Sequence, residues 1–145
     1  MASRSIEHLH PNLQPLCRAF LHNCEEAGLN VIITCTYRTN AEQEQLYALG
    51  RTVKSHIGPF NAKRPLGSTV TNARAGQSAH NFSIAGVPAA KAFDIGVLVN
   101  GKYDAAGTHP DWQVAGKIGM ELGLKWYGAP GSPFHELPHF ELKST

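Results

Sequence analysis

A single acidic residue, Asp94, interrupts an otherwise apolar stretch, Ala92–Val99. Asn100-Gly101 follows this stretch, and that pair suits the two positive φ angles of a type I′ turn. We therefore predict a strand and a tight hairpin to Lys102-Tyr103. An ionised carboxylate within a buried strand is costly unless it is paired or bound to a metal. Asp94 thus needs a partner, which is either an arginine in a structural salt bridge or a metal ion.

Apolar residues at helical spacing predict three helices, each closed by a glycine. The predicted helices span about residues 12–27, residues 39–50 with a Thr39/Glu42 capping box, and residues 108–123 with Pro110 in the first turn. Short β-branched or aromatic runs predict strands at residues 30–36, 92–99, 124–126 and 139–142. Together these elements indicate an α+β fold, with helices packed on a small, mainly antiparallel sheet.

Length and composition narrow the classes of protein. A chain of 145 residues with 42% hydrophobic and 17% charged residues fits one soluble globular domain, residues 1–145, which we expect to be a monomer. The net charge of +2 is too mild to indicate nucleic-acid binding. No apolar run is long enough to span a membrane, and the first residues lack the apolar core of a signal peptide. The cytoplasm is the expected place of synthesis and folding.

Two groups of residues leave alternatives open. The three cysteines, Cys17, Cys24 and Cys35, have no C-x-x-C spacing, so we interpret them as buried structural thiols, with a reactive or metal-binding thiol as the alternative.

The irregular segment 51–77 is long for a compact domain, which favours a functional role. Its cations form either a solvated loop or a surface for an anionic polymer such as bacterial cell wall. These cations are Arg51, Lys54, Lys63, Arg64 and Arg74.

A candidate metal centre is formed by residues near the C-terminus and in the middle of the chain. Glu136 lies three residues before His139, and His80 and Asp94 are the comparable pair upstream. Two imidazoles and one carboxylate can hold zinc and leave a fourth position open to water, while a second carboxylate acts as base. Taken singly, each histidine is better explained as a surface residue or a hydrogen-bonded core residue than as a metal ligand.

The same residues carry a family resemblance. Ser78-Ala79-His80, Ala92-Phe93-Asp94 and Glu136-Leu137-Pro138-His139-Phe140 resemble the S-x-H, A-x-D and [D/E]-x-x-H-F motifs of the zinc D-alanyl-D-alanine carboxypeptidase and dipeptidase superfamily, which also contains phage L-alanyl-D-glutamate endopeptidases. Upstream, the chain is similar to the phage enzymes in further short motifs. These are Leu9-His10-Pro11, Thr36-Tyr37-Arg38-Thr39, Gln43, Leu46-Tyr47 and Gly50-Arg51.

The resemblance implies a hedgehog/DD-peptidase-like fold and a role for each matching residue. His80, Asp94 and His139 would bind Zn²⁺, and Glu136 would be the general base. Arg38 would stabilise the oxyanion, a role that suits a permanently charged guanidinium with several donors. Ser78 and Gln43 would support the site through hydrogen bonds.

One departure from the family pattern concerns the first two ligands. Thirteen residues lie between His80 and Asp94, whereas the superfamily has a shorter spacer. The extra piece, about Ser83 to Lys91, is interpreted as an inserted loop that adds a rim to the cleft if the strands stay in register. If they do not, His80 is the ligand in doubt, and the replacements to test are His56, His109 and His135, with His135 the least favoured.

The expected function is a zinc metallopeptidase that hydrolyses stem peptides of bacterial peptidoglycan. Within that class we favour a phage endolysin that cuts between L-alanine and D-glutamate and accumulates in the host cytoplasm before its release to the wall. The alternatives are a D-Ala-D-Ala carboxypeptidase or dipeptidase and a non-catalytic wall-binding module on the same fold. A serine hydrolase built from Ser78, His80 and Asp94 is a weaker third, because Ser78 lacks a nucleophile-elbow context.

Overall fold

The computed structural model describes residues 2–132 and 135–143. Its longer helices are α1 (Gln14–Glu26), α2 (Asn40–Ala48) and α3 (Asp111–Glu121), and its short 3₁₀ helices are η1 (Ile6–His8) and η2 (Ala79–Asn81). The strands are β1 (Val31–Cys35), β2 (Ser83–Ile84), β3 (Val87–Pro88), β4 (Ala92–Val99), β5 (Lys102–Tyr103), β6 (Lys125–Trp126) and β7 (His139–Glu141).

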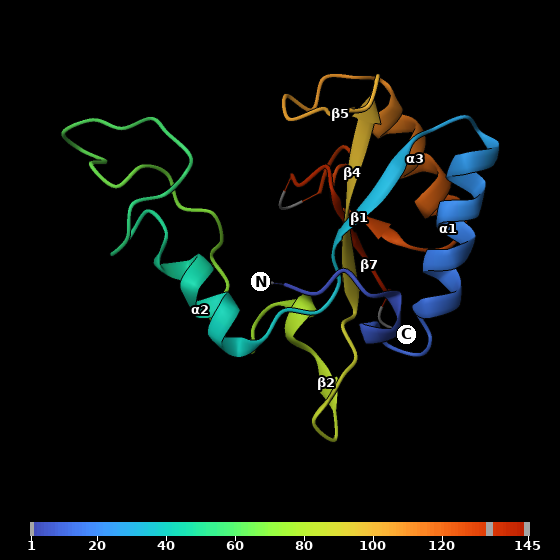
Figure 1. Ribbon diagram of the computed structural model, residues 1–145, viewed down its shortest axis with the longest axis horizontal. Helices are drawn as coiled ribbons and strands as arrows, with labels where there is room; N and C mark the ends of the chain where they lie inside the picture. Colours follow the sequence, from blue (N-terminus) through green and yellow to red (C-terminus); the bar gives the residue numbers. More distant parts are fainter. Residues whose placement is uncertain (1, 133–134, 144–145) are drawn as a thin grey trace.

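The main sheet is antiparallel throughout, with the order β1-β4-β7-β6 and β5 paired to the end of β4. Helices α1 and α3 lie side by side against this sheet (Figure 1). The predicted hairpin is confirmed, since Asn100 and Gly101 connect β4 to β5 with φ angles of 53° and 78°. The long strand β4 therefore occupies the middle of the sheet and carries Asp94 with it.

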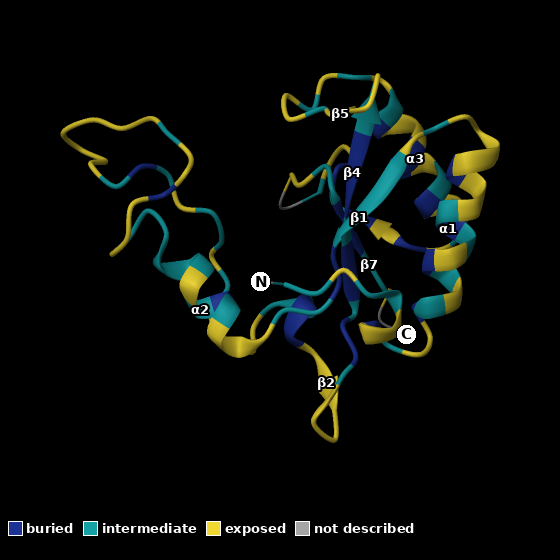
Figure 2. Ribbon diagram, in the orientation of Figure 1, coloured by how far each residue is buried: buried dark blue, intermediate teal, exposed yellow. Residues whose placement is uncertain are grey.

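Aromatic rings hold the helices to the sheet. Phe20 of α1 packs against Phe93 of β4 and Phe140 of β7, with ring centroids 5.5 and 4.8 Å away. All three rings are fully buried. Buried residues, in dark blue, make up much of β4 (Figure 2). Burial of a large side chain contributes roughly 1.5–3 kcal/mol. The layer between sheet and helices is thus a rigid base for side chains on the other side of β4 and β7.

Two glycines allow α3 to approach the sheet closely. A methyl group at Gly116 would overlap the ring of Trp126, and one at Gly119 would overlap the ring of Phe140. The backbone of α3 therefore lies directly on these two aromatic rings. Glycine weakens a helix by roughly 0.5–1 kcal/mol relative to alanine. In α3 this cost is offset by the close packing that the two glycines allow.

Helix α2 and the irregular residues after it form a separate lobe, residues 40–77, beside the sheet (Figure 1). The predicted capping box is confirmed: Thr39 Oγ1 accepts from the Glu42 N–H at 3.0 Å, and the Glu42 carboxylate accepts from the Thr39 N–H at 2.9 Å. Within residues 51–77, all of them described, the structure contains no helix or strand.

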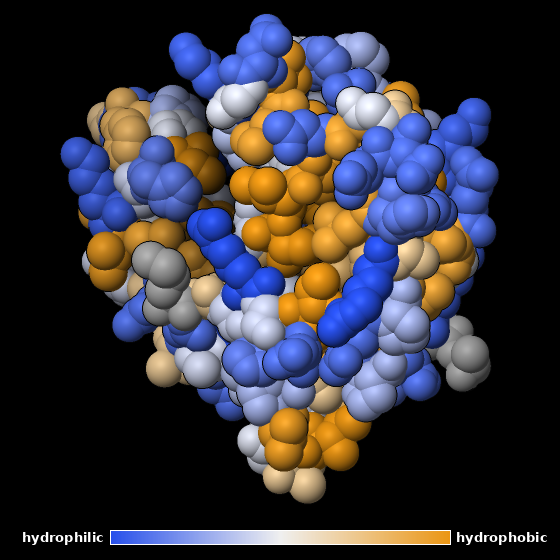
Figure 3. Space-filling view, turned by 45° about the vertical axis from the view of Figure 1, so that its right-hand side comes forward, coloured by the Kyte–Doolittle hydropathy of each residue, from blue (hydrophilic) through white to orange (hydrophobic). Residues whose placement is uncertain are grey.

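The inserted segment folds as the hairpin β2–β3, which projects from the body of the protein (Figure 1). Its paired residues Ile84 and Val87 are exposed, and apolar atoms gather at this tip in the space-filling view (Figure 3). The expected rim to the cleft is wrong, because no hairpin residue is among the described residues that line the cleft.

The predicted start of the third helix also needs correction. Helix α3 begins at Asp111, and Pro110 precedes it without a side-chain cap. The turn is held by Asp104 Oδ2, which accepts from the His109 N–H at 3.0 Å and from Trp112 Nε1 at 2.9 Å. The predicted start at residue 108 is therefore wrong by three residues, and Asp104, in the loop before the helix, holds its first turn. Across the described residues, no helix combines the length and apolar character needed to cross a membrane.

Candidate metal centre and active site

The three predicted metal ligands lie together on the open side of the sheet. Asp94 Oδ1 is 3.2 Å from His80 Nε2 and 3.0 Å from His139 Nδ1. Asp94 and His139 are direct cross-strand partners on β4 and β7, and His80 comes from η2. The insertion therefore leaves His80 beside Asp94, in a position where both side chains can face one ion.

In each histidine, the ring nitrogen that does not face Asp94, here called the outer nitrogen, has its own hydrogen-bond partner. His80 Nδ1 lies 2.8 Å from the backbone oxygen of Thr36, and His139 Nε2 lies 2.9 Å from Glu141 Oε1. Both partners are acceptors, so these outer nitrogens carry the protons in the neutral rings. Each neutral ring then directs a lone pair from its inner nitrogen toward the Asp94 carboxylate. This is the tautomer that a histidine needs to bind a metal.

The donor set fits zinc. Tetrahedral zinc with bonds of about 2.0–2.1 Å places its ligand atoms about 3.3 Å apart, close to the 3.0 and 3.2 Å from Asp94 Oδ1 to the two inner nitrogens. Two imidazoles and one carboxylate are also a ligand set of catalytic zinc sites. The rings of His80 and His139 meet edge to face, with centroids 5.1 Å apart.

The charges in this cluster are strongly coupled. Burial disfavours a charged ring at His80, but the Asp94 carboxylate outweighs burial and raises the pKa of His80 to about 10. Burial likewise opposes charge on His139, and hydrogen bonds to Asp94 and Glu141 raise its pKa to about 9. Burial acts to raise the pKa of Asp94, yet the two histidines hold it well below its usual value. Without metal, both rings are therefore doubly protonated at neutral pH and donate to Asp94 from their inner nitrogens, and a metal would have to displace these inner protons.

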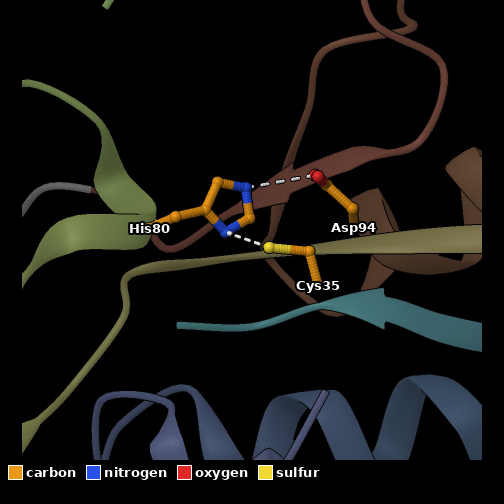
Figure 4. Close-up of side chains that lie close together, drawn as sticks. All are labelled: Cys35, His80 and Asp94. Atoms are coloured by element: carbon orange, nitrogen blue, oxygen red, sulfur yellow. Dashed lines mark hydrogen bonds and ion pairs between the residues drawn. The ribbon is translucent and has the colours of Figure 1, made fainter. Parts of the chain in front are cut away.

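Cys35 provides an alternative donor to this cluster. Its sulfur, one His80 nitrogen and a carboxylate oxygen of Asp94 lie within 4.8 Å of one another. Figure 4 shows these three side chains pointing toward each other. However, Cys35 Sγ is 3.6 Å from Nδ1 of His80, the nitrogen that faces the Thr36 carbonyl. The sulfur therefore lies beside the outer nitrogen of His80, and the inner nitrogen faces Asp94. We take His80, Asp94 and His139 as the better donor set.

Arg38 lies next to this cluster and is held from several directions. Its Nη1 donates to Gln43 Oε1 at 2.8 Å, and its Nη2 donates to Cys35 Sγ at 3.4 Å. The Arg38 N–H donates to the carbonyl of His80 at 2.9 Å. Gln43 is itself fully buried and donates to the carbonyl of Ala73 at 2.7 Å. The guanidinium is thus oriented by Gln43 of α2, and the backbone of Arg38 is hydrogen-bonded to that of the predicted ligand His80.

Ser78 supports the backbone that carries His80. Its hydroxyl accepts from the His80 N–H at 3.2 Å and forms a capping box with Asn81. The contact is with the backbone of His80 and not with its ring, so a Ser78–His80–Asp94 nucleophile triad is not assembled. The geometry therefore does not support the serine hydrolase alternative.

Glu136 lies at the edge of the same cleft. Its Oε2 is 3.8 Å from His139 Nδ1, and its side chain is 54% exposed. The cleft has a volume of about 720 Å³, and Arg38, His80, Asp94, Glu136 and His139 all line it. An exposed carboxylate beside the predicted ligands can exchange protons with solvent in the cleft.

The three substitute histidines differ in position. His56 is exposed in the lobe, and His109 pairs with Asp111 at 3.5 Å. His135 does line the cleft, but no bond from it to Asp94 is present among the described residues.

Two residues near the site, Glu141 and Tyr127, were not anticipated from the sequence. Glu141 bonds the outer nitrogen of His139, and the Tyr127 hydroxyl donates to Glu141 Oε2 at 3.1 Å. Glu141 lies two residues after His139 on one strand, so the period of two could have placed both on one face. Tyr127 gave no comparable signal. Cys35 is a buried free thiol, as predicted, and because it contacts both Arg38 and His80 the alternative of a metal-binding thiol stays open.

Comparison with known proteins identifies the class of protein. The family model VanY, D-alanyl-D-alanine carboxypeptidase, matches residues 6–94. The chain therefore belongs to the VanY family of peptidases and is an enzyme. It is 31% identical over 135 residues to the peptidoglycan L-alanyl-D-glutamate endopeptidase CwlK of Bacillus subtilis (strain 168), covering 92% of this chain and 73% of that protein.

Two solved structures share the fold. The LD-carboxypeptidase LdcB superposes with a TM-score of 0.63 at 16% identity, over 92% of this chain but only 58% of the LdcB chain. The L-Ala D-Glu endopeptidase ChiX of Serratia marcescens gives a TM-score of 0.60 at 16% identity, over 99% of this chain and 89% of the ChiX chain. The predicted α+β fold of the DD-peptidase type is confirmed.

Proposed function

We propose that this chain is a zinc-dependent peptidase that hydrolyses the stem peptides of bacterial peptidoglycan at the bond between L-alanine and D-glutamate. One observation carries the proposal: His80, Asp94 and His139 converge in a cleft that Arg38 and Glu136 also line. The choice of bond is supported by CwlK and ChiX, whose names specify L-Ala-D-Glu endopeptidases.

Zinc binding is assigned to His80 Nε2, His139 Nδ1 and the Asp94 carboxylate. When bound, zinc supplies Lewis acidity, which lowers the pKa of water toward about 7 and polarises a carbonyl group. The Thr36 carbonyl and the Glu141 carboxylate hold the two rings in the ligating tautomer.

Glu136 is assigned as the general base. Its carboxylate lies beside His139 and remains half exposed, so it can accept a proton from water in the cleft and pass it to the leaving amine. Its Oε2 lies 3.8 Å from the inner nitrogen of His139, one of the atoms that would hold the metal.

Arg38 is assigned to the oxyanion. The bond to Gln43 and the contact with Cys35 orient its guanidinium before substrate arrives. A pre-oriented donor stabilises developing negative charge without the cost of reorganisation, and loss of one such donor reduces kcat by about 10²–10³.

The decisive experiment is mass spectrometry of purified peptidoglycan after digestion. An endopeptidase of the proposed specificity exposes a new N-terminal D-glutamate, whereas a carboxypeptidase releases D-alanine. Glu136→Gln should abolish product, and Glu25→Gln, an exposed glutamate on α1, should not. Release of D-alanine alone would replace the proposed bond with the carboxypeptidase alternative. Wall binding without any product from the wild type would favour a non-catalytic module.

A phage origin and a role as endolysin rest on the motif resemblance and extend this proposal. We propose that residues 1–145 act as one monomeric catalytic domain that accumulates in the host cytoplasm. Expression in a bacterial host should be tolerated until a membrane-permeabilising protein is co-induced, and lysis should then follow. Lysis without permeabilisation, or none with it, would contradict that role.

A further inference from the structure

The charge of this chain is distributed very unevenly. Residues 45–93 contain six Lys or Arg residues and no Asp or Glu, whereas the rest of the chain has seven basic and eleven acidic residues. A segment with a charge of +6 is therefore attached to a remainder with a charge of −4. Such an excess attracts anions over about one Debye length, roughly 8 Å at physiological salt.

Three of these cations line one cavity in the lobe. The cavity has a volume of about 390 Å³, and Arg51, Lys63 and Arg64 contribute its charge. Gly50 closes one wall: it has a φ of +79°, and a side chain there would overlap the backbone of Ser68. The cavity is thus formed by tightly apposed backbone with cations around it.

The backbone around Lys63 and Arg64 is held by hydrogen bonds. Asn61 Oδ1 accepts from the Lys63 N–H and from the Arg64 N–H, both at 3.0 Å. The carbonyl of Arg64 then accepts from the Gly67 N–H at 3.1 Å. This turn places two adjacent cations at the same cavity without a regular element.

The three cations differ in their partners. Arg51 Nη1 donates to the carbonyls of Tyr47 at 2.7 Å and Thr71 at 2.9 Å, and its guanidinium stacks 3.8 Å from the Tyr47 ring centroid. Lys63 and Arg64 are exposed, and no hydrogen bond or ion pair of their side chains is present among the described residues. One cation is fixed in place, and two are available to an anion.

The cavity adjoins the catalytic cleft. Thr69 lines the cavity, while the next two residues, Val70 and Thr71, line the cleft. One short segment therefore lines both spaces, so a polymer longer than the cleft can extend toward Lys63 and Arg64. The proposed substrate presents carboxylates at regular intervals, because its stem peptides repeat along the wall and contain D-glutamate.

We propose that Arg51, Lys63 and Arg64 form a second binding subsite, which captures a carboxylate of a stem peptide adjacent to the one being cleaved. The inference rests on the proposed function and extends it from the scissile bond to the surrounding polymer. Its effect appears with polymeric wall and is absent with a single soluble stem peptide.

The test compares Lys63→Ala/Arg64→Ala with the matched control Arg18→Ala/Lys117→Ala, which removes the same charge from exposed positions on α1 and α3. Each pair is placed in a Glu136→Gln background, and binding to purified sacculi is measured by co-sedimentation. We expect the half-saturating amount of sacculi to rise about threefold to tenfold for the first pair only, a range typical of two exposed charge contacts. Salt at about 0.5 M should remove most of that difference.

Chemically altered sacculi identify the anion. Amidation of wall carboxylates should abolish the difference between the first pair and its control, and removal of phosphate-containing polymers should preserve it. If phosphate removal abolishes the difference instead, the carboxylate assignment is overturned. Equal binding by both pairs overturns the subsite itself.

A kinetic arm separates this inference from the proposed function. With Glu136 intact, Lys63→Ala/Arg64→Ala should keep wild-type kcat/KM on a soluble stem peptide and lose turnover on sacculi. An equal loss on both substrates places these cations in the catalytic site and overturns the subsite. If the wild type cleaves neither substrate but the binding difference persists, the proposed reaction fails and the subsite stands.

Discussion

His139 Nδ1 lies 3.0 Å from Asp94 Oδ1, and the two residues face each other across β7 and β4 although 45 positions separate them in the chain. The register of these two strands therefore assembles the core of the candidate metal centre. His80 joins it at 3.2 Å from the same carboxylate oxygen. The central position of Asp94 makes it the residue whose loss should disrupt the site most.

Asp94→Asn should remove zinc from the protein. The substitution keeps the side-chain shape but replaces the anion that faces both histidines, so we expect a loss of zinc affinity above about 100-fold, more than the loss of an outer-shell partner causes. Metal content after dialysis is the measurement. Glu121→Gln, exposed on α3, is the control, and stoichiometric zinc in Asp94→Asn would contradict the assigned ligand set.

Glu141→Gln should weaken zinc binding by about 10–100-fold, because the carboxylate fixes the His139 ring through Nε2 at 2.9 Å. Tyr127→Phe should have a smaller effect, since it removes only the hydrogen bond to Glu141 at 3.1 Å. Competition with a chromophoric chelator measures both affinities. The idea fails if Glu141→Gln binds zinc as tightly as the wild type does.

Arg38→Lys should lower kcat by about 10²–10³ on a soluble stem peptide while zinc content stays unchanged. A lysine keeps the charge but loses the forked donors, one of which contacts Gln43 at 2.8 Å. Steady-state kinetics combined with metal analysis separates this effect from metal loss. Unchanged kcat would exclude Arg38 from oxyanion stabilisation.

The metal-free protein should become less stable as the pH rises from about 7 to 10. An unfolded histidine has a pKa of about 6.5, whereas the pKa is raised to about 10 at His80 and to about 9 at His139. A raised folded pKa contributes stability that is complete below pH 6.5 and is lost as pH passes through the folded values. Thermal melts in a chelator should show this trend.

His139→Gln provides the comparison for the pH experiment, because its melting temperature should depend less on pH over the same interval. The lowered pKa of Asp94 acts at the other end of the range, so its contribution is lost as the pH falls below about 4. A wild-type melting temperature that stays level or rises from about pH 7 to 10 would contradict the proposed pairing.

Gly116→Ala should destabilise the fold by about 1–3 kcal/mol, because the added methyl group overlaps the Trp126 ring. This cost exceeds the gain in helix propensity, which is at most about 1 kcal/mol. Denaturant unfolding measures the difference, with Gln113→Ala at an exposed position of α3 as the control. A stabilised Gly116→Ala variant would show that α3 can move away from the sheet.

Local sequence patterns were sufficient for several elements. The capping box of Thr39 and Glu42 begins α2, and the Asn100-Gly101 turn connects β4 to β5, because each involves only neighbouring residues. The start of α3 was predicted wrongly, because its first turn is held by Asp104, a residue of the preceding loop and not of the helix itself.

Residue types and motif order also indicated His80, Asp94 and His139 as candidate ligands, and the structure places them at one point. The supporting contacts were harder to predict. A register shift in β1 between Ile33 and Cys35 sets Cys35 opposite Asp94, which brings its sulfur near His80 and Arg38. Nothing in the residues around Cys35 encodes that shift.

Amino-acid type and short-range spacing thus specified which groups could bind a metal and which segments could form helices, strands and turns, because those preferences act over a few residues. Strand register, the choice of ring nitrogen that faces Asp94, and the cation cavity beside the cleft were decided by the folded chain. Each of them depends on contacts between residues far apart in sequence, which exist only once the core has packed.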